Sequence, residues 1–164
     1  MTQKSPKTAF FAGSFNPFTV GHASVVDRAL ALFDRVVVGI GVNAAKPGSA
    51  DSARERAEAV RRVYAGEPRV EVTVYTGLTV DACREAGAGF LLRGVRTVAD
   101  FEYERGIADL NREISGLETV ILFSLPGHGA VSSSAVRELA SYGVDVSRFL
   151  PGGDRNGASP ASNK

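Results

Sequence analysis

The chain has 164 residues, of which 44% are hydrophobic and 23% are charged, and its formal net charge is +1. These values are typical of one soluble globular domain, and a charge so close to neutral argues against a general field that would attract nucleic acid or an anionic membrane. Cys83 is the only cysteine, which excludes an internal disulfide and suits the reducing cytoplasm where we expect the protein to work.

Apolar, β-branched runs alternate with helical patterns along the chain. The predicted strands are 8–12, 35–42, 70–75, 89–92 and 119–125, and the predicted helices are 22–33, 52–64, 79–85, 98–113 and 133–142. This alternation predicts an α/β fold: a Rossmann-like, doubly wound parallel sheet of five strands with helices on both faces. We expect residues 1–151 to form a single domain, and the Gly- and Ser-rich stretch 152–164 to be a disordered tail.

The loop after the first strand consists of turn formers and small hydroxyl residues, Gly13-Ser-Phe-Asn-Pro-Phe-Thr-Val-Gly-His22. Free backbone N–H groups and the positive end of the helix dipole make the start of a helix a site for anions. His22 falls in the first helical turn, so the pattern predicts a phosphate site that contains a catalytic donor. The loop alone leaves two other interpretations open, a tight connection and an ordinary capping histidine.

The second strand ends in Gly39-Ile-Gly-Val-Asn-Ala44, which imitates a dinucleotide-binding fingerprint. Such a fingerprint must open a helix, whereas Lys46-Pro-Gly48 is typical of a loop, so we reject that interpretation. The two glycines are expected to let another backbone or a ligand approach closely. Lys46 is either a solvated loop lysine or a phosphate partner at the end of the strand.

The fourth strand runs directly into Arg93-Gly-Val-Arg96. Guanidinium groups match phosphate oxygens in pairs, so these two arginines can hold a polyphosphate, with the Gly94 amide close by. They could instead satisfy nearby carboxylates or helix carbonyls. Asp100 and Glu102 follow in a first helical turn, where acids offset the helix dipole.

The fifth strand is followed by Pro126-Gly-His-Gly-Ala-Val-Ser-Ser-Ser134. Three serines at the start of a helix supply caps, and they also supply hydroxyl and N–H groups for a second anion site. His128 could be exposed and idle, although its loop is a candidate pocket wall.

Three separated strings now agree: Gly13 to His22, Arg93-Gly-Val-Arg-Thr-Val-Ala-Asp-Phe-Glu-Tyr-Glu104, and Val131-Ser-Ser-Ser134. Together they resemble the bacterial phosphopantetheine adenylyltransferases over residues 8–151. The first and third strings resemble the wider nucleotidyltransferase superfamily with its T/H-x-G-H signature, here Thr19 to His22, which includes the nicotinate mononucleotide enzymes. The middle string is the specific one.

The resemblance implies adenylyl transfer from ATP to 4′-phosphopantetheine, giving dephospho-coenzyme A and pyrophosphate, the penultimate step of coenzyme A biosynthesis. Attack would be direct and in line, with no covalent enzyme intermediate and no protein base. Mg²⁺ would be carried mainly by ATP oxygens, with no protein metal ligand. The alternatives are a nicotinate mononucleotide adenylyltransferase and a catalytically silent nucleotide-binding regulator.

The resemblance also assigns roles to residues. The catalytic residues would be His22, which stabilises the transition state, together with Lys46 and Ser14. Phosphopantetheine would contact Ser14, Lys46, Leu78, Thr79 and Arg93. ATP would contact Ser14, Phe15, His22, Gly94, Val95, Arg96, Glu104, His128, Gly129, Ala130, Val131, Ser132, Ser133 and Ser134.

The chain departs from the family pattern in several places. Ser14 stands where the family usually has Thr, and Thr79 is smaller and more polar than the hydrophobic residue often found there. Gly106 interrupts a helix, at a cost of about 1 kcal/mol against Ala, and close packing against a neighbouring element or subunit would explain it. Family members form hexamers, so we expect a homohexamer, with coenzyme A as a possible feedback ligand, although a polar tail replaces the usual last helix.

Overall fold

The computed structural model describes residues 6–152. Its strands are β1 (Thr8–Gly13), β2 (Arg35–Gly41), β3 (Val70–Tyr75), β4 (Phe90–Val95) and β5 (Glu118–Phe123). Its helices are α1 (Val20–Ala29), α2 (Ser49–Val63), α3 (Thr79–Glu85), α4 (Val98–Ser115) and α5 (Ser133–Ser141), followed by the short 3₁₀ helix η1 (Ser147–Phe149). Every predicted strand and helix is confirmed, and β3 and α3 begin and end at the predicted residues. The sequence did not predict η1, and stretch 153–164 of the predicted tail lies outside the described residues.

Helix α1 ends earlier than predicted. The amides of Leu32 and Phe33 both donate to the carbonyl of Ala29, at 2.9 Å each, so the chain leaves the helix in a tight turn before β2. Phe33 still packs in the core, which is why its apolar character extended the predicted helix.

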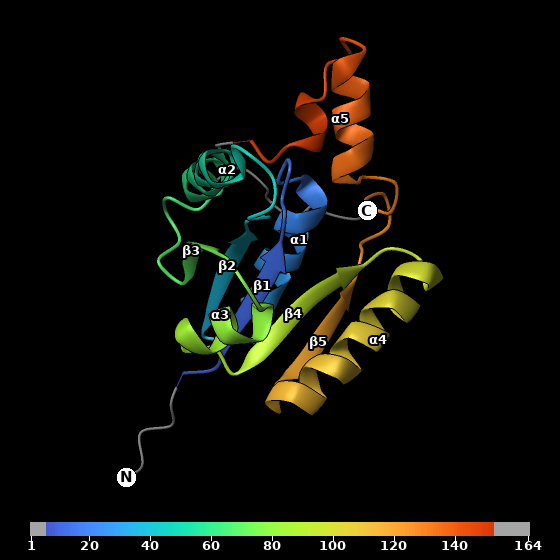
Figure 1. The fold of residues 1–164 in the computed structure, drawn as a ribbon. Coiled ribbons are helices and arrows are strands. Elements are labelled where there is room, and N and C mark those ends of the chain that lie inside the picture. Colours follow the sequence, from blue (N-terminus) through green and yellow to red (C-terminus); the bar gives the residue numbers. More distant parts are fainter. Residues whose placement is uncertain (1–5, 153–164) are drawn as a thin grey trace.

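The five strands form one parallel sheet in the order β3-β2-β1-β4-β5 (Figure 1). The chain first winds outward through β2 and β3 and then returns to place β4 on the other side of β1. The predicted doubly wound α/β fold is therefore confirmed. The order of strands reverses between β1 and β4, and in such sheets ligands bind beyond the carboxyl ends of the strands at this point.

The sheet is covered on both faces because successive strand residues point to opposite sides. Ala9 and Phe11 of β1 belong to a core cluster with α1 and α2, whereas Phe10 and Ala12 belong to a cluster with α3. The arrangement fixes β1 at the centre of the sheet, and Phe15 and Phe18 of the loop that follows it belong to the core cluster with α1 and α2.

The glycines at the end of β2 have a packing role. A Cβ atom at Gly39 would lie 2.2 Å from the Phe10 ring, and one at Gly41 would lie 3.4 Å from the Tyr75 hydroxyl. The expected close approach is therefore made by two aromatic side chains and by no backbone segment, because β1 and β3 place those rings over β2. Turn residues follow as predicted, and α2 begins at Ser49, ahead of the predicted start at residue 52.

Among the described helices, none combines the length and the apolarity that crossing a bilayer requires.

Candidate active site

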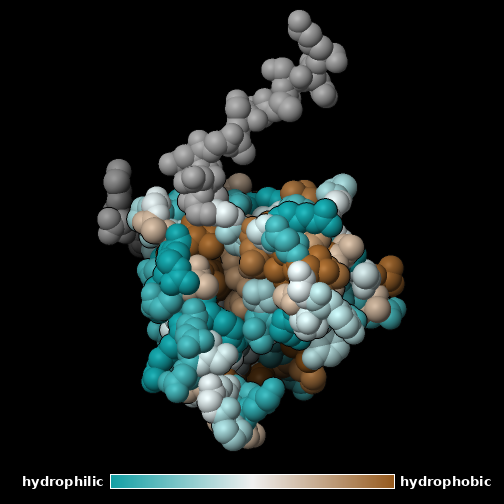
Figure 2. Space-filling model, turned by 90° about the horizontal axis from the view of Figure 1, so that it is seen from above, coloured by the Kyte–Doolittle hydropathy of each residue, from teal (hydrophilic) through white to brown (hydrophobic). Residues whose placement is uncertain are grey.

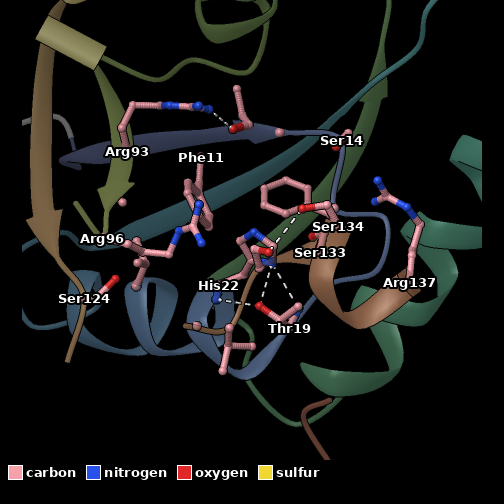
Figure 3. Close-up of a pocket in the computed structure, with 18 residues that line it drawn as sticks. Phe11, Ser14, Thr19, His22, Arg93, Arg96, Ser124, Ser133, Ser134 and Arg137 are labelled. Atoms are coloured by element: carbon pink, nitrogen blue, oxygen red, sulfur yellow. Dashed lines mark hydrogen bonds between the residues drawn. The ribbon is translucent and has the colours of Figure 1, made fainter. Parts of the chain in front are cut away.

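A cavity of about 380 Å³ lies at the carboxyl end of the sheet, where the strand order reverses. Figure 2 views the molecule from this end and shows its surface hollowed. Most of the lining of this first cavity comes from three parts of the chain: the β1–α1 loop, the end of β4 and the start of α5 (Figure 3). Its polar lining residues are Ser14, Thr19, His22, Arg93, Arg96, Ser124, Ser132, Ser133, Ser134 and Arg137. The fold therefore brings all three strings of the sequence to one place.

The β1–α1 loop is held from two helices. Arg56 of α2 donates to the carbonyl of Ser14, and Arg137 of α5 donates to the carbonyl of Asn16. The Ser133 hydroxyl donates to the carbonyl of Pro17 at 2.8 Å. Phe15 is 3% exposed and adopts a positive φ of 45°, which bulky residues rarely do. The loop is thus locked in one conformation by contacts that are far apart in the sequence.

His22 is the third residue of α1, and a capping box fixes its ring. The backbone N–H of Thr19 donates to Nδ1 of His22 at 2.9 Å, while the Thr19 hydroxyl accepts from the His22 amide at 3.5 Å. A backbone N–H can only donate, so Nδ1 is the acceptor and the proton of the neutral ring sits on Nε2. No described residue accepts a hydrogen bond from Nε2, which leaves an N–H donor for a ligand in the first cavity.

The surroundings of His22 keep the ring neutral. It packs against the rings of Phe15 and Phe18, with centroids 5.0 and 5.5 Å away. Burial, reinforced by the positive charges of Arg93 and Arg96, lowers the pKa of His22 to about 4. Near neutral pH, His22 is therefore a neutral donor and carries no positive charge.

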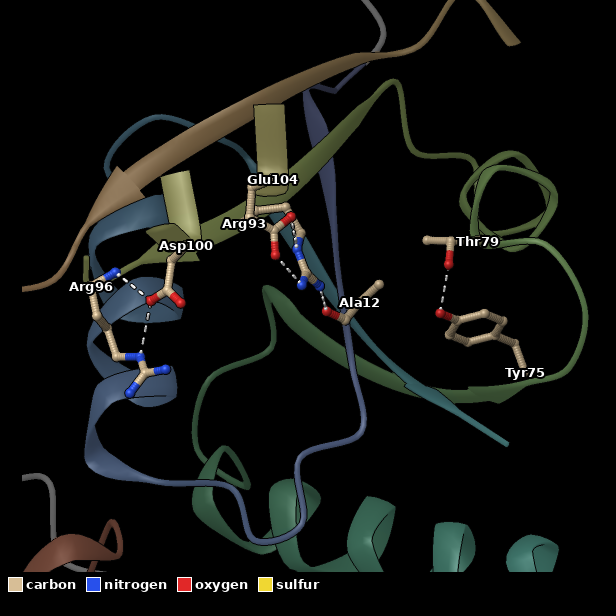
Figure 4. A network of polar contacts seen from close by, with 7 residues as sticks. All are labelled: Ala12, Tyr75, Thr79, Arg93, Arg96, Asp100 and Glu104. Atoms are coloured by element: carbon tan, nitrogen blue, oxygen red, sulfur yellow. Dashed lines mark hydrogen bonds and ion pairs between the residues drawn. The ribbon is translucent and has the colours of Figure 1, made fainter. Parts of the chain in front are cut away.

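Arg93 and Glu104 form a two-point ion pair at the edge of the cavity (Figure 4). Nε of Arg93 lies 2.8 Å from Oε2 of Glu104, and Nη2 lies 2.5 Å from Oε1. The same guanidinium donates to the carbonyl of Ala12. Glu104 is 7% exposed and does not line the first cavity. Arg93 therefore pairs with a carboxylate, which is one of the alternatives that the sequence left open. These contacts also hold the Arg93 guanidinium in a fixed position where it lines the cavity.

A second cavity of about 310 Å³ lies on the other side of Arg93, between α3, α4 and β4. Its lining includes Leu78 and Thr79, the predicted contacts of the acceptor substrate, together with Tyr103, Ile107 and Asn111 of α4. A third cavity connects these two spaces and is lined by Ala12, Gly13, Ser14, Gly41, Val42, Asn43, Tyr75, Gly77, Thr79 and Arg93. Ala12 and Arg93 line all three cavities, so the site is a trough in which two ligands can meet beside them.

The serine triplet at the start of α5 both caps the helix and lines the first cavity, so the two interpretations of it are compatible. Ser132 caps the helix, accepting from the amide of Ala135 at 3.1 Å, while all three serines face the first cavity. Arg137, one turn further along α5, also lines it and was missed by the sequence analysis. A basic residue three positions after a serine triplet that opens a helix is the signal that would have found it.

Several residues predicted to contact ATP do not line the first cavity. They are Val95, which is buried at the end of β4, Glu104, His128, Gly129 and Ala130. His128 instead lies against α1, where it lines a separate cavity with Ser24 and Asp27, and its Nδ1 atom is buried without a hydrogen-bond partner. Gly94 does line the first cavity, but a Cβ atom there would lie 2.9 Å from Val25 of α1, so its small size also serves packing.

Lys46 lies apart from the other candidate residues. It is exposed on the β2–α2 loop and lines none of the first three cavities, although Val42 and Asn43 of the same loop line the third. Within residues 6–152 there is also no cluster of three or more His, Cys, Asp or Glu side chains that could hold a metal ion.

Comparison with known proteins identifies the group to which this arrangement is similar. A family model described as cytidylyltransferase-like matches residues 10–139. A phosphopantetheine adenylyltransferase of Porphyromonas gingivalis is 54% identical over 145 residues, covering 88% of this chain and 94% of the relative. One from Bacteroides fragilis is 48% identical over 147 residues, covering 90% and 97%.

Solved structures share the fold at low sequence identity. A bifunctional NMN adenylyltransferase/ADP ribose pyrophosphatase from Francisella tularensis superposes with a TM-score of 0.66 at 15% identity, covering 91% of this chain. The chain spans 46% of that longer protein. A putative nicotinate-nucleotide adenylyltransferase from Vibrio parahaemolyticus gives a TM-score of 0.56 at 18% identity, covering 89% of this chain and 94% of that one.

Proposed function

The chain belongs to the phosphopantetheine adenylyltransferases, within the cytidylyltransferase-like family, and from this we infer that it transfers the adenylyl group of ATP to 4′-phosphopantetheine. The products are dephospho-coenzyme A and pyrophosphate, so the reaction is a step of coenzyme A biosynthesis. One observation in the structure carries this conclusion: a neutral histidine donor, arginines and serine hydroxyls line a single cavity, and a second cavity opens beside it.

We propose that ATP binds in the first cavity with its phosphates between Arg96, Arg137 and the serines of α5. Phosphopantetheine would lie in the second and third cavities, with its phosphate near Ser14, which lines both the first cavity and the third. This arrangement brings an oxygen of the acceptor phosphate to the α-phosphorus of ATP. A new P–O bond forms there, the bond to the bridging α–β oxygen breaks, and pyrophosphate leaves with the electron pair.

No general base is required, because the attacking phosphate oxygen is already an anion. The protein contributes position and charge stabilisation. Nε2–H of His22 would donate to a non-bridging oxygen of the α-phosphate, where charge builds up in the transition state. The Thr19 backbone N–H holds the ring in the tautomer that this donation requires.

Mg²⁺ would enter with ATP, bound to its phosphate oxygens, and would neutralise charge on the departing pyrophosphate. The donor set of the first cavity supports this assignment, because guanidinium, N–H and hydroxyl groups bind phosphate oxygens and give a cation no carboxylate cluster. Lys46 would reach the acceptor phosphate from the β2–α2 loop above the third cavity.

We also propose that the protein is a homo-oligomer, with the family's hexamer as the expected form. Helix α4 supports this because one of its faces exposes large apolar side chains: Tyr103, Leu110 and Ile114 are each at least 60% exposed, and Ile107 on the same face is 38% exposed. No atom approaches within 4 Å of a Cβ built at Gly106, so no neighbouring element of this chain accounts for that glycine. Sedimentation velocity would distinguish a monomer from the hexamer.

Coenzyme A is a candidate feedback ligand, since it carries the same pantetheine arm as the acceptor. We expect the protein to work in the cytoplasm with these small molecules as its partners. A catalytically silent regulator is disfavoured because His22, Arg93 and Arg96 are all in place around the cavity.

A coupled pyrophosphate-release assay tests the proposed function. With ATP and Mg²⁺, the protein should turn over 4′-phosphopantetheine and should give no more than background rates with nicotinate mononucleotide. Turnover of nicotinate mononucleotide alone would replace the proposal by its first rival. If the protein binds ATP measurably but releases no pyrophosphate with either acceptor, the silent regulator is favoured.

A further inference from the structure

Two hydroxyl groups meet where the second and third cavities join. The Tyr75 Oη atom at the end of β3 lies 2.9 Å from Oγ1 of Thr79 at the start of α3 (Figure 4). Thr79 lines both cavities, and Tyr75 lines the third. The pair therefore stands on the path that leads away from Arg93 and the reacting phosphates.

The position of the Tyr75 hydroxyl is fixed by packing. Its ring rests on the Phe10 ring in an edge-to-face contact, with centroids 5.6 Å apart, and packs against the core cluster under α3. Gly41 lies beneath the hydroxyl, and a Cβ atom there would approach it to 3.4 Å. A hydroxyl held in this way is a rigid contact point, because binding a ligand to it costs little further ordering.

The hydrogen-bonding capacity of the pair is only partly used. Two hydroxyl groups offer two donors and four lone pairs, and their mutual bond consumes one of each. One donor and three lone pairs remain, next to a cavity whose walls include Leu78 and Val80. An amide fits such a place, since its carbonyl can accept the remaining donor or its N–H can donate to one of the remaining lone pairs.

We propose that the Tyr75–Thr79 hydroxyl pair recognises an amide of the pantetheine arm, the one nearer to the phosphate, and so determines specificity for the acceptor. The proposal rests on the proposed function, because that function supplies an acceptor with an amide next to its phosphate-bearing end. The sequence analysis expected Thr79 to contact phosphopantetheine. The proposal now specifies that the Thr79 hydroxyl makes this contact and that Tyr75, on another element, makes it together with Thr79.

The test compares Tyr75→Phe and Thr79→Val with the wild type, using two acceptors. One is 4′-phosphopantetheine, and the other is 3-hydroxy-2,2-dimethylpropyl phosphate, which keeps the phosphate and the branched carbon but lacks the amide. Each variant should raise KM for phosphopantetheine by about 5- to 10-fold, the effect of one lost hydrogen bond, with kcat and KM for ATP nearly unchanged. The short acceptor should lose nothing, and Thr79→Ser, which keeps the hydroxyl, should behave as the wild type.

Tyr142→Phe is the matched control, since Tyr142 is 79% exposed at the end of α5 and lines none of the three cavities. An unchanged KM for phosphopantetheine in both variants would overturn the proposal. An equal loss with both acceptors would also overturn it, because the pair would then only brace the β3–α3 turn. If the wild type itself fails to use phosphopantetheine, the proposed function fails before this inference is reached.

Discussion

The two loops that carry the predicted catalytic residues are built in opposite ways. The β1–α1 loop buries Phe15, Phe18 and Thr19, each at most 6% exposed, and receives hydrogen bonds from α2 and α5. The β2–α2 loop, which carries Lys46, is exposed and bonded mainly within itself: Asn43 receives a hydrogen bond from Ala45 at its side chain and from Lys46 at its backbone.

The difference separates two kinds of catalytic group. His22 is placed by packing before any substrate arrives, which is what stabilising a transition state requires. Lys46 sits on a segment with few contacts to the rest of the fold, so it can change position without breaking the core. We expect the first loop to determine the chemical step and the second to act mainly on the acceptor.

The largest expected effect tests the rigid loop. Replacing His22 by Ala should lower kcat by about 100-fold or more, since one preorganised donor contributes on the order of 3 kcal/mol. The affinity for ATP, measured by calorimetry, should change far less, because Arg96, Arg137 and the serines of α5 remain. His22→Gln, which keeps an N–H donor, should recover part of the rate. A turnover close to that of the wild type in His22→Ala would remove His22 from its assigned role.

Arg93 tests the boundary between the two substrates. Arg93→Ala should weaken phosphopantetheine binding by about 10- to 100-fold, which is the range for losing a hydrogen bond to a charged group. It also leaves the buried Glu104 carboxylate without its partner, so Tm should fall. The double variant Arg93→Ala/Glu104→Gln should restore Tm and leave the affinity low. If the double variant restores both, Arg93 only neutralises Glu104 and does not hold the substrate.

The sequence predicted the parts of this site that depend on local pattern. Apolar runs alternating with helical patterns placed the strands and helices, and the helical pattern that starts at His22 placed that histidine in the first turn of α1. The sequence analysis did not predict contacts made by the topology. Arg93 pairs with Glu104 only because α4 packs back on β4. Arg137 reaches Asn16 only because the chain after β5 places the start of α5 against the β1–α1 loop.

Several residues predicted to contact ATP do not line the first cavity, and the reason is again that the path of the chain in space cannot be predicted from local pattern. The segment 128–134 was treated as one wall, but only its second half, from Val131, lines the cavity. The turn at Pro126–Gly127, where Gly127 has a φ of 88°, sends His128 toward α1 instead. No periodicity in a Gly-rich loop reports such a change of direction.

Lys46 tests the exposed loop. Lys46→Ala should lower kcat/KM for phosphopantetheine by about 10-fold, the cost of one charge-assisted contact, and leave Tm unchanged because the residue is exposed. Lys46→Arg should retain most of the activity if charge alone is needed. A loss as large as that of His22→Ala would contradict the division of labour between the two loops, and no loss at all would make Lys46 an ordinary surface lysine.

The smallest expected effect is that the NMR signals of the His22 ring do not change near neutral pH. This prediction tests whether the β1–α1 loop keeps the ring neutral. The chain has only two histidines, so ring signals in ¹H–¹⁵N spectra of the free enzyme can be assigned with the His22→Ala variant. Between pH 5.5 and 8 the His22 signals should stay in the Nε2–H tautomer pattern, and they should titrate only near a pKa of about 4.

The lowered pKa of His22 also makes the stability of the fold depend on pH. Because this pKa lies below the ordinary value of 6.5, the unfolded chain binds a proton at His22 more readily than the folded chain does. The stability that neutral His22 contributes above pH 6.5 is therefore lost as the pH falls toward 4. A titration near 6.5 would mean that the aromatic rings and the two arginines do not control the ring, and the contrast between the two loops would then lose its basis.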